Sequence, residues 1–380
     1  MNVPKLRFKE FNDEWVEDKI NALVELNPKN PSLPESFIYI DLESVSNGIL
    51  LQEKIINKND APSRAQRQVK LNDILYQTVR PYQKNNLFID KLSNLPYIAS
   101  TGYAIMREKK IYQKFLFNKL HTDIFVNEVL DNCTGTSYPA INSNDLGNIK
   151  IYYPNNVKEQ EKIGNFLSLL DKKIELQTKK IEDLKLFKKG LYNIIKNLNC
   201  ESEYFLSEIV NFENGKGHES IVDENGEYIL VNSKFISTEG KVIKKCTEQL
   251  CPLQERDIVM VMSDLPNGKA LAKCFYIDEN NIYSLNQRIC LLRANDNIDS
   301  KYLFYKINRN PYYLKFDDGV NQTNLKKDDV LNLVVSLPNF SYQKKYSQIM
   351  TSYDKKINAE VVYLNKLIEL KKGLMQNMFV

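Results

Sequence analysis

The chain has 380 residues, of which 43% are hydrophobic and 26% are charged, and its formal net charge at pH 7 is +4. This length suffices for two or three globular domains, and the composition is ordinary for a water-soluble protein. The positive charge is too weak to identify a polyanionic partner by itself.

Membrane, export and metal signals are missing from the sequence. No run of about 18 apolar residues occurs, and the first residues lack the apolar core of a signal peptide, so we expect a cytoplasmic protein with no membrane contact. The six cysteines show no C-x-x-C spacing, and the only histidines are His121 and His218. We therefore expect reduced cysteines and no metal site.

Residues 1–155 are predicted to form one α+β unit with a mostly antiparallel sheet. Apolar residues from Trp15 to Leu26 give a short amphipathic opening, which turn residues end at 27–31. Alternating runs rich in β-branched and aromatic residues predict the strands that follow. The predicted elements are strands at 37–41, 73–76, 97–106 and 149–153, a short helix at 112–119, a loop at 135–139 and a helical turn at 143–147.

A lysine-rich helical stretch at 156–199 recurs at 340–380. Two four-residue motifs are identical in both copies, and both recur at the same offset, because 354 minus 171 equals 371 minus 188. A fixed offset over so long a segment indicates that half of the protein is duplicated. The motifs are Asp171-Lys-Lys-Ile174 with Asp354-Lys-Lys-Ile357, and Lys188-Lys-Gly-Leu191 with Lys371-Lys-Gly-Leu374.

Apolar residues in both stretches alternate steps of four and three, which is the period of a coiled-coil seam. Polar residues interrupt both seams at equivalent places, Gln177 and Lys188 in the first and Glu360 and Lys371 in the second. We predict an antiparallel helix pair that sets Lys188 against Glu360 and Gln177 against Lys371. A slip by one heptad would bury a lysine against leucine or isoleucine, which is unfavourable. The alternative is that each helix lies on its own domain and turns its polar positions outward.

Residues 200–339 repeat the frame of the first unit at a constant offset, because 257 minus 73 equals 319 minus 135. The loops differ, because 59–70 is replaced by 239–256 and 79–86 by 263–270. Two copies of one scaffold with unlike loops predict two related ligands that are read differently. The matching positions are Asp73 with Asp257, Gly135 with Gly319, Asp145 with Asp329, and Pro154 with Pro338.

Both loop sets are rich in side chains that bind nucleic acids. Arg and Lys reach phosphate or guanine O6 and N7, and Asn and Gln can pair with adenine N6 and N7. A single such residue is more often a solvated loop residue, so the prediction depends on their recurrence in two loop sets. The candidate DNA-binding residues are Arg64, Arg67, Lys70, Arg80, Lys84, Ser137, Tyr138, Lys216, His218, Asn267, Lys269, Gln287, Arg288, Asn321 and Gln322.

The alternation of variable domain, helix, variable domain and helix resembles the specificity subunits of type I restriction-modification systems. The resemblance is also carried by the start of the first helix and by its copy, which is one residue shorter: Pro154-x5-Gln160-x2-Ile163 and Pro338-x4-Gln343-x2-Tyr346. The loops led by Gly135 and Gly319 resemble the glycine-led loop of the family, although its usual glutamine stands only in the second, at Gln322.

The resemblance implies that each domain is a target-recognition domain for one half of a split site in double-stranded DNA. It also implies that the helices space the halves and dock two methylation subunits, and that restriction subunits join through the complex. S-adenosylmethionine, ATP and Mg²⁺ would then bind the partner subunits. The target adenine would be flipped into a methylation subunit, and this chain would hold no cofactor and no catalytic residue.

Two other functions can be weighed against this one. Asn310-Pro-Tyr-Tyr313 is similar to the Asn-Pro-Pro-Tyr/Phe box of amino-methyltransferases but lacks the second proline, so a helix-ending turn is the better interpretation. A coiled-coil scaffold whose two domains bind proteins is the main alternative. It predicts apolar or acidic loop tips and binding that is indifferent to salt, whereas DNA binding weakens as salt rises.

Overall fold

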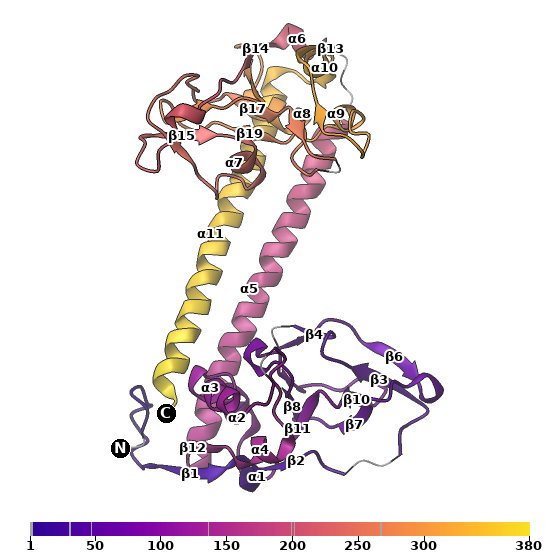
Figure 1. The fold of residues 1–380 in the computed structure, drawn as a ribbon, viewed down its shortest axis with the longest axis vertical. Coiled ribbons are helices and arrows are strands. Elements are labelled where there is room, and N and C mark those ends of the chain that lie inside the picture. The colour runs from indigo at the N-terminus through magenta and orange to yellow at the C-terminus, as the bar shows by residue number, and fades with distance from the viewer. Residues whose placement is uncertain are drawn as a thin grey trace. The chain divides into compact units, whose positions relative to one another are not determined.

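The computed structural model describes residues 3–29, 32–46, 48–135, 137–198, 200, 202–266 and 268–380. The chain divides into two compact units, one formed by Met1–Lys179 with Val362–Val380 and the other by Lys180–Val361 (Figure 1). Each unit holds one α+β domain and part of two long helices, α5 (Val157–Asn197) and α11 (Phe340–Met378). Over the described ranges, no helix is both long enough and apolar enough to cross a membrane.

The first domain is built on two four-stranded sheets, in the orders β6-β3-β10-β7 and β2-β11-β8-β9. Their neighbouring strands are antiparallel except β3 and β10, and β1 pairs with β12 just before α5 begins. The strands are β1 (Trp15–Lys19), β2 (Val24–Leu26), β3 (Ser36–Ile40), β4 (Val45–Ser46), β5 (Ile49–Leu50), β6 (Lys54–Asn57), β7 (Ala65–Val69), β8 (Ile74–Gln77), β9 (Leu87–Phe88), β10 (Tyr97–Ser100), β11 (Tyr103–Glu108) and β12 (Lys150–Pro154). The helices are α1 (Ile20–Leu23), α2 (Gln113–Lys119), α3 (Asp123–Asp131) and α4 (Ser143–Asn148), with 3₁₀ turns at Lys58–Asp60 and Pro81–Gln83.

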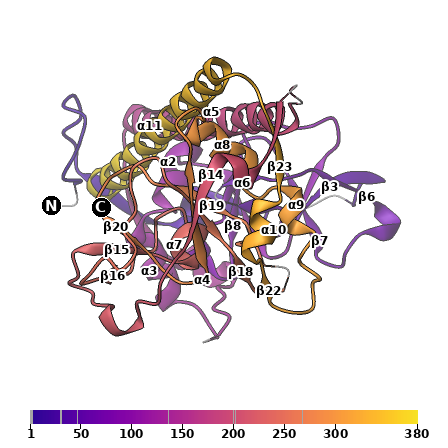
Figure 2. The same ribbon diagram turned by 90° about the horizontal axis from the view of Figure 1, so that it is seen from above.

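The second domain repeats this topology. The order β14-β21-β17-β19 corresponds to β2-β11-β8-β9, and the parallel pair of β15 and β20 corresponds to β3 and β10. Helix α8 lies near α11 (Figure 2). The ring centroids of Tyr302 on α8 and Tyr346 on α11 are 6.4 Å apart. The strands are β13 (Ser202–Phe205), β14 (Val210–Asn214), β15 (Tyr228–Val231), β16 (Lys245–Cys246), β17 (Ile258–Val261), β18 (Ser263–Asp264), β19 (Cys274–Tyr276), β20 (Tyr283–Leu285), β21 (Ile289–Ala294), β22 (Thr323–Asn324) and β23 (Val334–Leu337). The helices are α6 (Leu206–Ile209), α7 (Ser233–Ser237), α8 (Ser300–Ile307), α9 (Pro311–Leu314) and α10 (Lys327–Leu331), with a 3₁₀ turn at Glu219–Ile221. The predicted α+β class, its mostly antiparallel sheets and the duplication are confirmed.

An ion pair with a buried aspartate occurs at equivalent positions of both domains, where it joins β11 to the start of β8 and β21 to the start of β17. The Arg107 guanidinium binds the two carboxylate oxygens of Asp73 at 3.0 and 2.7 Å. In the second domain Arg293 binds Asp257 in the same way, at 2.7 and 2.8 Å. Both aspartates are 1% exposed, and a carboxylate buried to this extent needs such partners, because an unpaired charge in the interior is strongly destabilising. The sequence match between Asp73 and Asp257 therefore has a structural cause.

A glutamine near the start of each long helix joins three elements of its domain. The side-chain amide of Gln160 donates to the Pro154 carbonyl at 2.8 Å, and its oxygen accepts the Tyr112 N–H ahead of α2 at 2.8 Å. Gln343 makes the equivalent two bonds at 2.7 and 3.0 Å, although it follows its proline one residue sooner. These bonds explain why both long helices carry a glutamine shortly after a proline.

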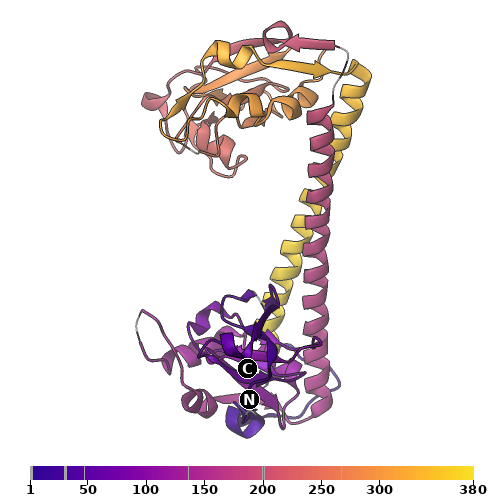
Figure 3. The same cartoon turned by 90° about the vertical axis from the view of Figure 1, so that its right-hand side faces the viewer.

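Helices α5 and α11 lie side by side within each unit (Figure 3). Every side chain on the two predicted seams is buried or half-buried, which confirms the seam. The helices are antiparallel, because partner numbers on α11 fall as those on α5 rise. In the first unit the contacts are Asp171 with Lys371 and Lys173 with Tyr363, and in the second they are Lys180 with Glu360, Phe187 with Tyr353 and Lys188 with Asp354.

The predicted register is wrong. Lys188 binds Asp354 rather than Glu360, and Lys371 binds Asp171 rather than Gln177, so the shift is the same in both cases (360 minus 354 and 177 minus 171). The two lysine side chains are 27% and 23% exposed. Their aliphatic stems lie in the seam while the ammonium groups reach carboxylates at its edge. The prediction failed because it assumed that a lysine in the seam must bury its charge.

Candidate nucleic-acid interface

In each domain the loop that follows a buried strand meets the glycine-led loop at a short antiparallel backbone junction. Val79 pairs with Ala140 in the first domain, and Ser263 pairs with Asn324 in the second. The junctions are equivalent, because the two sides share one offset: 263 minus 79 equals 324 minus 140. Each one joins the loop after the buried strand β8 or β17 to the glycine-led loop, so the unlike loops at 79–86 and 263–270 lie beside the glycine-led loops of their domains.

In the first domain the junction carries an arginine that stacks on a tyrosine. Arg80 has a left-handed backbone with φ +53, and its N–H donates to the Pro139 carbonyl at 2.8 Å. Its guanidinium carbon lies 4.3 Å from the centre of the Tyr138 ring, and Tyr138 is 65% exposed. Ser137 beside it is also exposed. The pair presents a flat cationic and aromatic surface, which suits contact with a base or with phosphate.

The other basic candidates of the first domain are spread over its surface. Arg64 and Lys70 are exposed at the two ends of β7, which is an edge strand. Arg67 lies between them, donates to the Asn27 side chain, and has a guanidinium pKa that burial lowers. Lys84 binds Asp123 at 2.6 Å, and this hydrogen bond lowers the pKa of that carboxyl group. Arg67 and Lys84 therefore already have partners within the domain.

In the second domain, backbone bonds bring four loops together: 214–219, 262–270, 285–288 and 317–325. The Gln287 N–H donates to the Lys216 carbonyl at 2.9 Å, and the Met262 N–H donates to the Arg288 carbonyl at 2.9 Å. At the junction itself, the Gln322 amide donates to the Ser263 hydroxyl at 2.7 Å. Six predicted residues are exposed on these connected loops, namely Lys216, Lys269, Gln287, Arg288, Asn321 and Gln322.

Asp264 shapes the loop that follows the second junction. Its carboxylate accepts three backbone N–H groups at 2.9, 2.7 and 3.0 Å, those of Leu265, Ala270 and Leu271. A Cβ at Gly268 would lie 2.1 Å from this carboxylate, so only glycine fits there. The predicted residue Lys269 is exposed on the same loop. Sequence reasoning missed Asp264, although an Asp followed by Pro and Gly is typical of a turn closed by its own side chain.

His218, Asn267 and Asn321 differ from the other candidates of the second domain. His218 is fully buried, and its ring nitrogens lie 2.7 Å from the Lys216 carbonyl and 2.7 Å from the Ser284 hydroxyl. The prediction that it contacts DNA is wrong, and it braces the loop instead. Asn267 lies outside the described residues. The N–H of Asn321 and that of Val320 donate to Asp318 and lower the pKa of its carboxyl group.

Comparison with known proteins adds to this geometry. A profile of the type I restriction modification DNA specificity domain matches residues 12–186 and, in a second copy, residues 200–369. The chain belongs to this family. Each match takes in one α+β domain and most of the long helix that follows it, so the specificity domain of the family is the unit that is repeated here.

The individual proteins that this chain resembles are also specificity subunits of type I systems. The HindI type I restriction enzyme specificity subunit of Haemophilus influenzae is 29% identical over 161 residues, which are 41% of this chain and 34% of the relative. The MjaVIII specificity subunit of Methanocaldococcus jannaschii is 30% identical over 142 residues, 34% of this chain and 33% of the relative. The chain thus matches about a third of the length of each. The crystal structure of a type I S subunit from M. genitalium shares the fold at TM-score 0.62, with 18% identity over 100% of this chain and 99% of that one.

Proposed function

We propose that this chain is the sequence-specific DNA-binding subunit of a cytoplasmic type I restriction-modification complex. Each domain reads one half of a bipartite site in double-stranded DNA through the loops at its junction. One observation carries the proposal: two copies of the specificity domain of the family hold unlike polar and cationic side chains at equivalent junctions. A frame of this kind can present different contacts to two half-sites.

The paired helices are proposed to dock two methylation subunits. Glycine inside a helix is less stable than alanine by about 0.5–1 kcal/mol, yet a Cβ at Gly190 or Gly373 would meet no atom within 4 Å. A partner that approaches the backbone closely would explain a glycine at both equivalent positions. Large apolar side chains outside the seam also support docking, because they leave apolar surface uncovered. Examples are Leu169 (71% exposed) and Leu176 (56%) in the first unit, and Leu186 (70%) and Ile194 (53%) in the second.

Catalysis is proposed to belong to the partner subunits. S-adenosylmethionine would bind the methylation subunits, which would also receive the flipped adenine, and ATP and Mg²⁺ would serve restriction subunits that join through the complex. The contribution of this chain is then recognition and spacing.

Base-resolved mapping of adenine methylation tests the proposal. DNA is compared from cells that express this chain with its methylation subunit and from cells that express the methylation subunit alone. We expect a bipartite motif with a fixed gap that appears only when the chain is present. Methylation that is unchanged by the chain, although the subunits co-purify, would contradict the proposal and favour a protein-binding scaffold.

The salt dependence of the binding affinity is a second test that distinguishes DNA binding from a protein-binding scaffold. For DNA binding, the logarithm of the affinity should fall linearly with the logarithm of the salt concentration as counterions are released. Lys216→Ala and Lys269→Ala, if these lysines contact phosphate, should each reduce that slope by about one and weaken all DNA sequences alike. An affinity that does not change with salt would favour the scaffold.

A further inference from the structure

Arg288 has an unusual backbone conformation for an arginine. It lies in the turn between β20 and β21 with φ +67, in the left-handed region that glycine and asparagine normally occupy in turns. Its carbonyl accepts the Met262 N–H at 2.9 Å, which fixes the turn to the end of β17. The chain thus holds an arginine where glycine would be relaxed.

The Arg288 side chain is exposed, and within the described part of the chain no residue hydrogen-bonds or ion-pairs with its guanidinium. Carboxylates on the neighbouring loops already have donors. Glu219 accepts from the Gln287 amide, and Asp264 accepts the three N–H groups of its own loop. Asp318 accepts backbone N–H groups of the glycine-led loop. The backbone of Arg288 is therefore fixed, and its guanidinium is available to bind an acceptor outside the domain.

We infer that Arg288 reads a guanine in the half-site bound by the second domain, donating to O6 and N7 in the major groove. The inference rests on the proposed function. Arg288 is the only arginine in the four loops that meet at this junction, and the other cations there are Lys216 and Lys269. The planar fork of arginine matches the two acceptors of guanine, whereas lysine, a point charge on a flexible stem, suits phosphate.

Arg288→Gly tests the inference, because glycine relaxes the strained position and removes only the side chain. The complex with its methylation subunits is titrated with duplexes of the mapped site, in which each guanine is replaced in turn by 7-deazaguanine. This base pairs normally but lacks the N7 acceptor. The unchanged protein should lose about 10-fold in affinity at one guanine. Arg288→Gly should lose at least that factor on the intact site, because both bonds to the guanine are removed, and nothing further on that substituted duplex.

Arg256→Gly is a matched control. Arg256 is also exposed and left-handed, with φ +76, but it lies before β17, at the other end of that strand from Met262. We expect it to keep the affinity of the unchanged protein and the full loss at the same guanine. Neither glycine variant should lower the midpoint of unfolding.

Three results would overturn the assignment of Arg288. The Arg288→Gly complex could still discriminate that guanine, it could weaken equally on every duplex as a phosphate contact would, or the half-site bound by the second domain could contain no guanine. A different result would contradict the proposed function itself. If the unchanged complex recognises no bipartite site, the proposal that this chain reads DNA is wrong, and the inference about Arg288 is wrong with it.

Discussion

The two domains close the same junction with different chemistry. In the first, Arg80 stacks on the exposed ring of Tyr138. In the second, Gln322 bonds to Ser263, and the next loop is wrapped around the Asp264 carboxylate. The paired backbone beneath is the same in both. Because the junction is held by backbone bonds, its side chains can vary without loss of the fold, and specificity can diverge where stability does not depend on it.

The buried ion pairs that the two domains share, which we call the frame, do not differ between the domains as the junction does. The Asp73–Arg107 and Asp257–Arg293 pairs have nearly the same geometry in the two domains, and both aspartates are buried. Removal of one partner leaves a buried charge without compensation, so neither domain can vary this pair one residue at a time. Substitutions in the frame should therefore change stability, and substitutions in the loops should change recognition.

The largest expected effect is from Asp73→Ala and Asp257→Ala. Each should lower the free energy of unfolding by about 3 kcal/mol, because a half-buried guanidinium and the backbone N–H of Lys70 or Gln254 lose their buried acceptor. Denaturant titration measures the loss, and hydrogen exchange should show that it is confined to the domain that carries the substitution.

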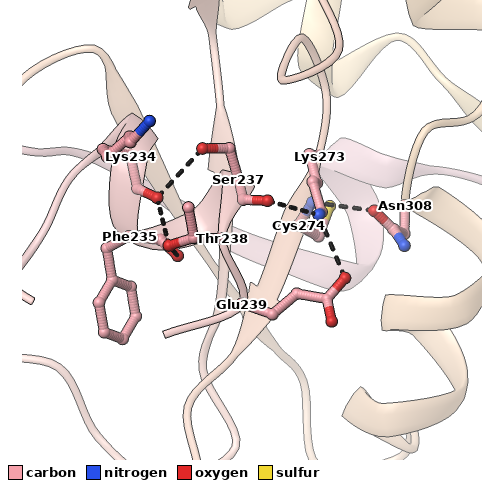
Figure 4. Close-up of polar contacts among 8 residues, drawn as sticks. All are labelled: Lys234, Phe235, Ser237, Thr238, Glu239, Lys273, Cys274 and Asn308. Carbon is pink, nitrogen blue, oxygen red and sulfur yellow. Dashed lines mark hydrogen bonds and ion pairs between the residues drawn. The ribbon is translucent and has the colours of Figure 1, made fainter. Parts of the chain in front are cut away.

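Glu239→Ala is the control for this prediction. Glu239 binds Lys273 at 3.2 Å in the second domain, but its side chain is 73% exposed (Figure 4). Loss of this surface pair should change the unfolding free energy by no more than about 0.5 kcal/mol. If Asp257→Ala were as mild as Glu239→Ala, the ion pair would not be the common frame of the two domains.

A smaller effect is expected at the starts of the two long helices. Gln160→Ala and Gln343→Ala each leave a backbone N–H and a carbonyl without their partner, and each should cost about 1–3 kcal/mol. Gln348→Ala, at an exposed position of α11, is the control and should be neutral. Unequal losses at Gln160 and Gln343 would show that the second helix, with its shorter spacing after the proline, uses its glutamine differently.

Structural features that follow from the burial of apolar or paired residues could be predicted from the sequence. Features that depend on which partner a polar side chain reaches could not. The period of four and three located both seams, and the repeated Asp73 and Asp257 located the frame. Polarity alone placed His218 on the surface, but its ring nitrogens find hydrogen-bond partners inside the domain, the Lys216 carbonyl and the Ser284 hydroxyl. The role of Asp264 follows from the path of its loop, which no periodicity encodes.

The helix register shows the same limit, although its signal was present. The ion pairs Lys188–Asp354 and Lys371–Asp171 are one pair that occurs twice, since their members occupy equivalent positions of the repeat. The two identical motifs of the helices therefore contain the two ends of each pair. A search for charge partners between the motifs would have found them.

The smallest expected effect would decide between the two registers. A double-mutant cycle of Lys188→Ala with Asp354→Ala should give a coupling of about 0.5–1 kcal/mol, because the pair is partly exposed. Asp354 also accepts a bond from the Tyr305 hydroxyl at 3.3 Å, but the cycle cancels that loss because it occurs in both variants that lack Asp354. The cycle of Lys188 with Glu360 should give no coupling, whereas Lys180 with Glu360, 2.6 Å apart, should give one. Coupling of Lys188 with Glu360 but not with Asp354 would restore the register predicted from the sequence.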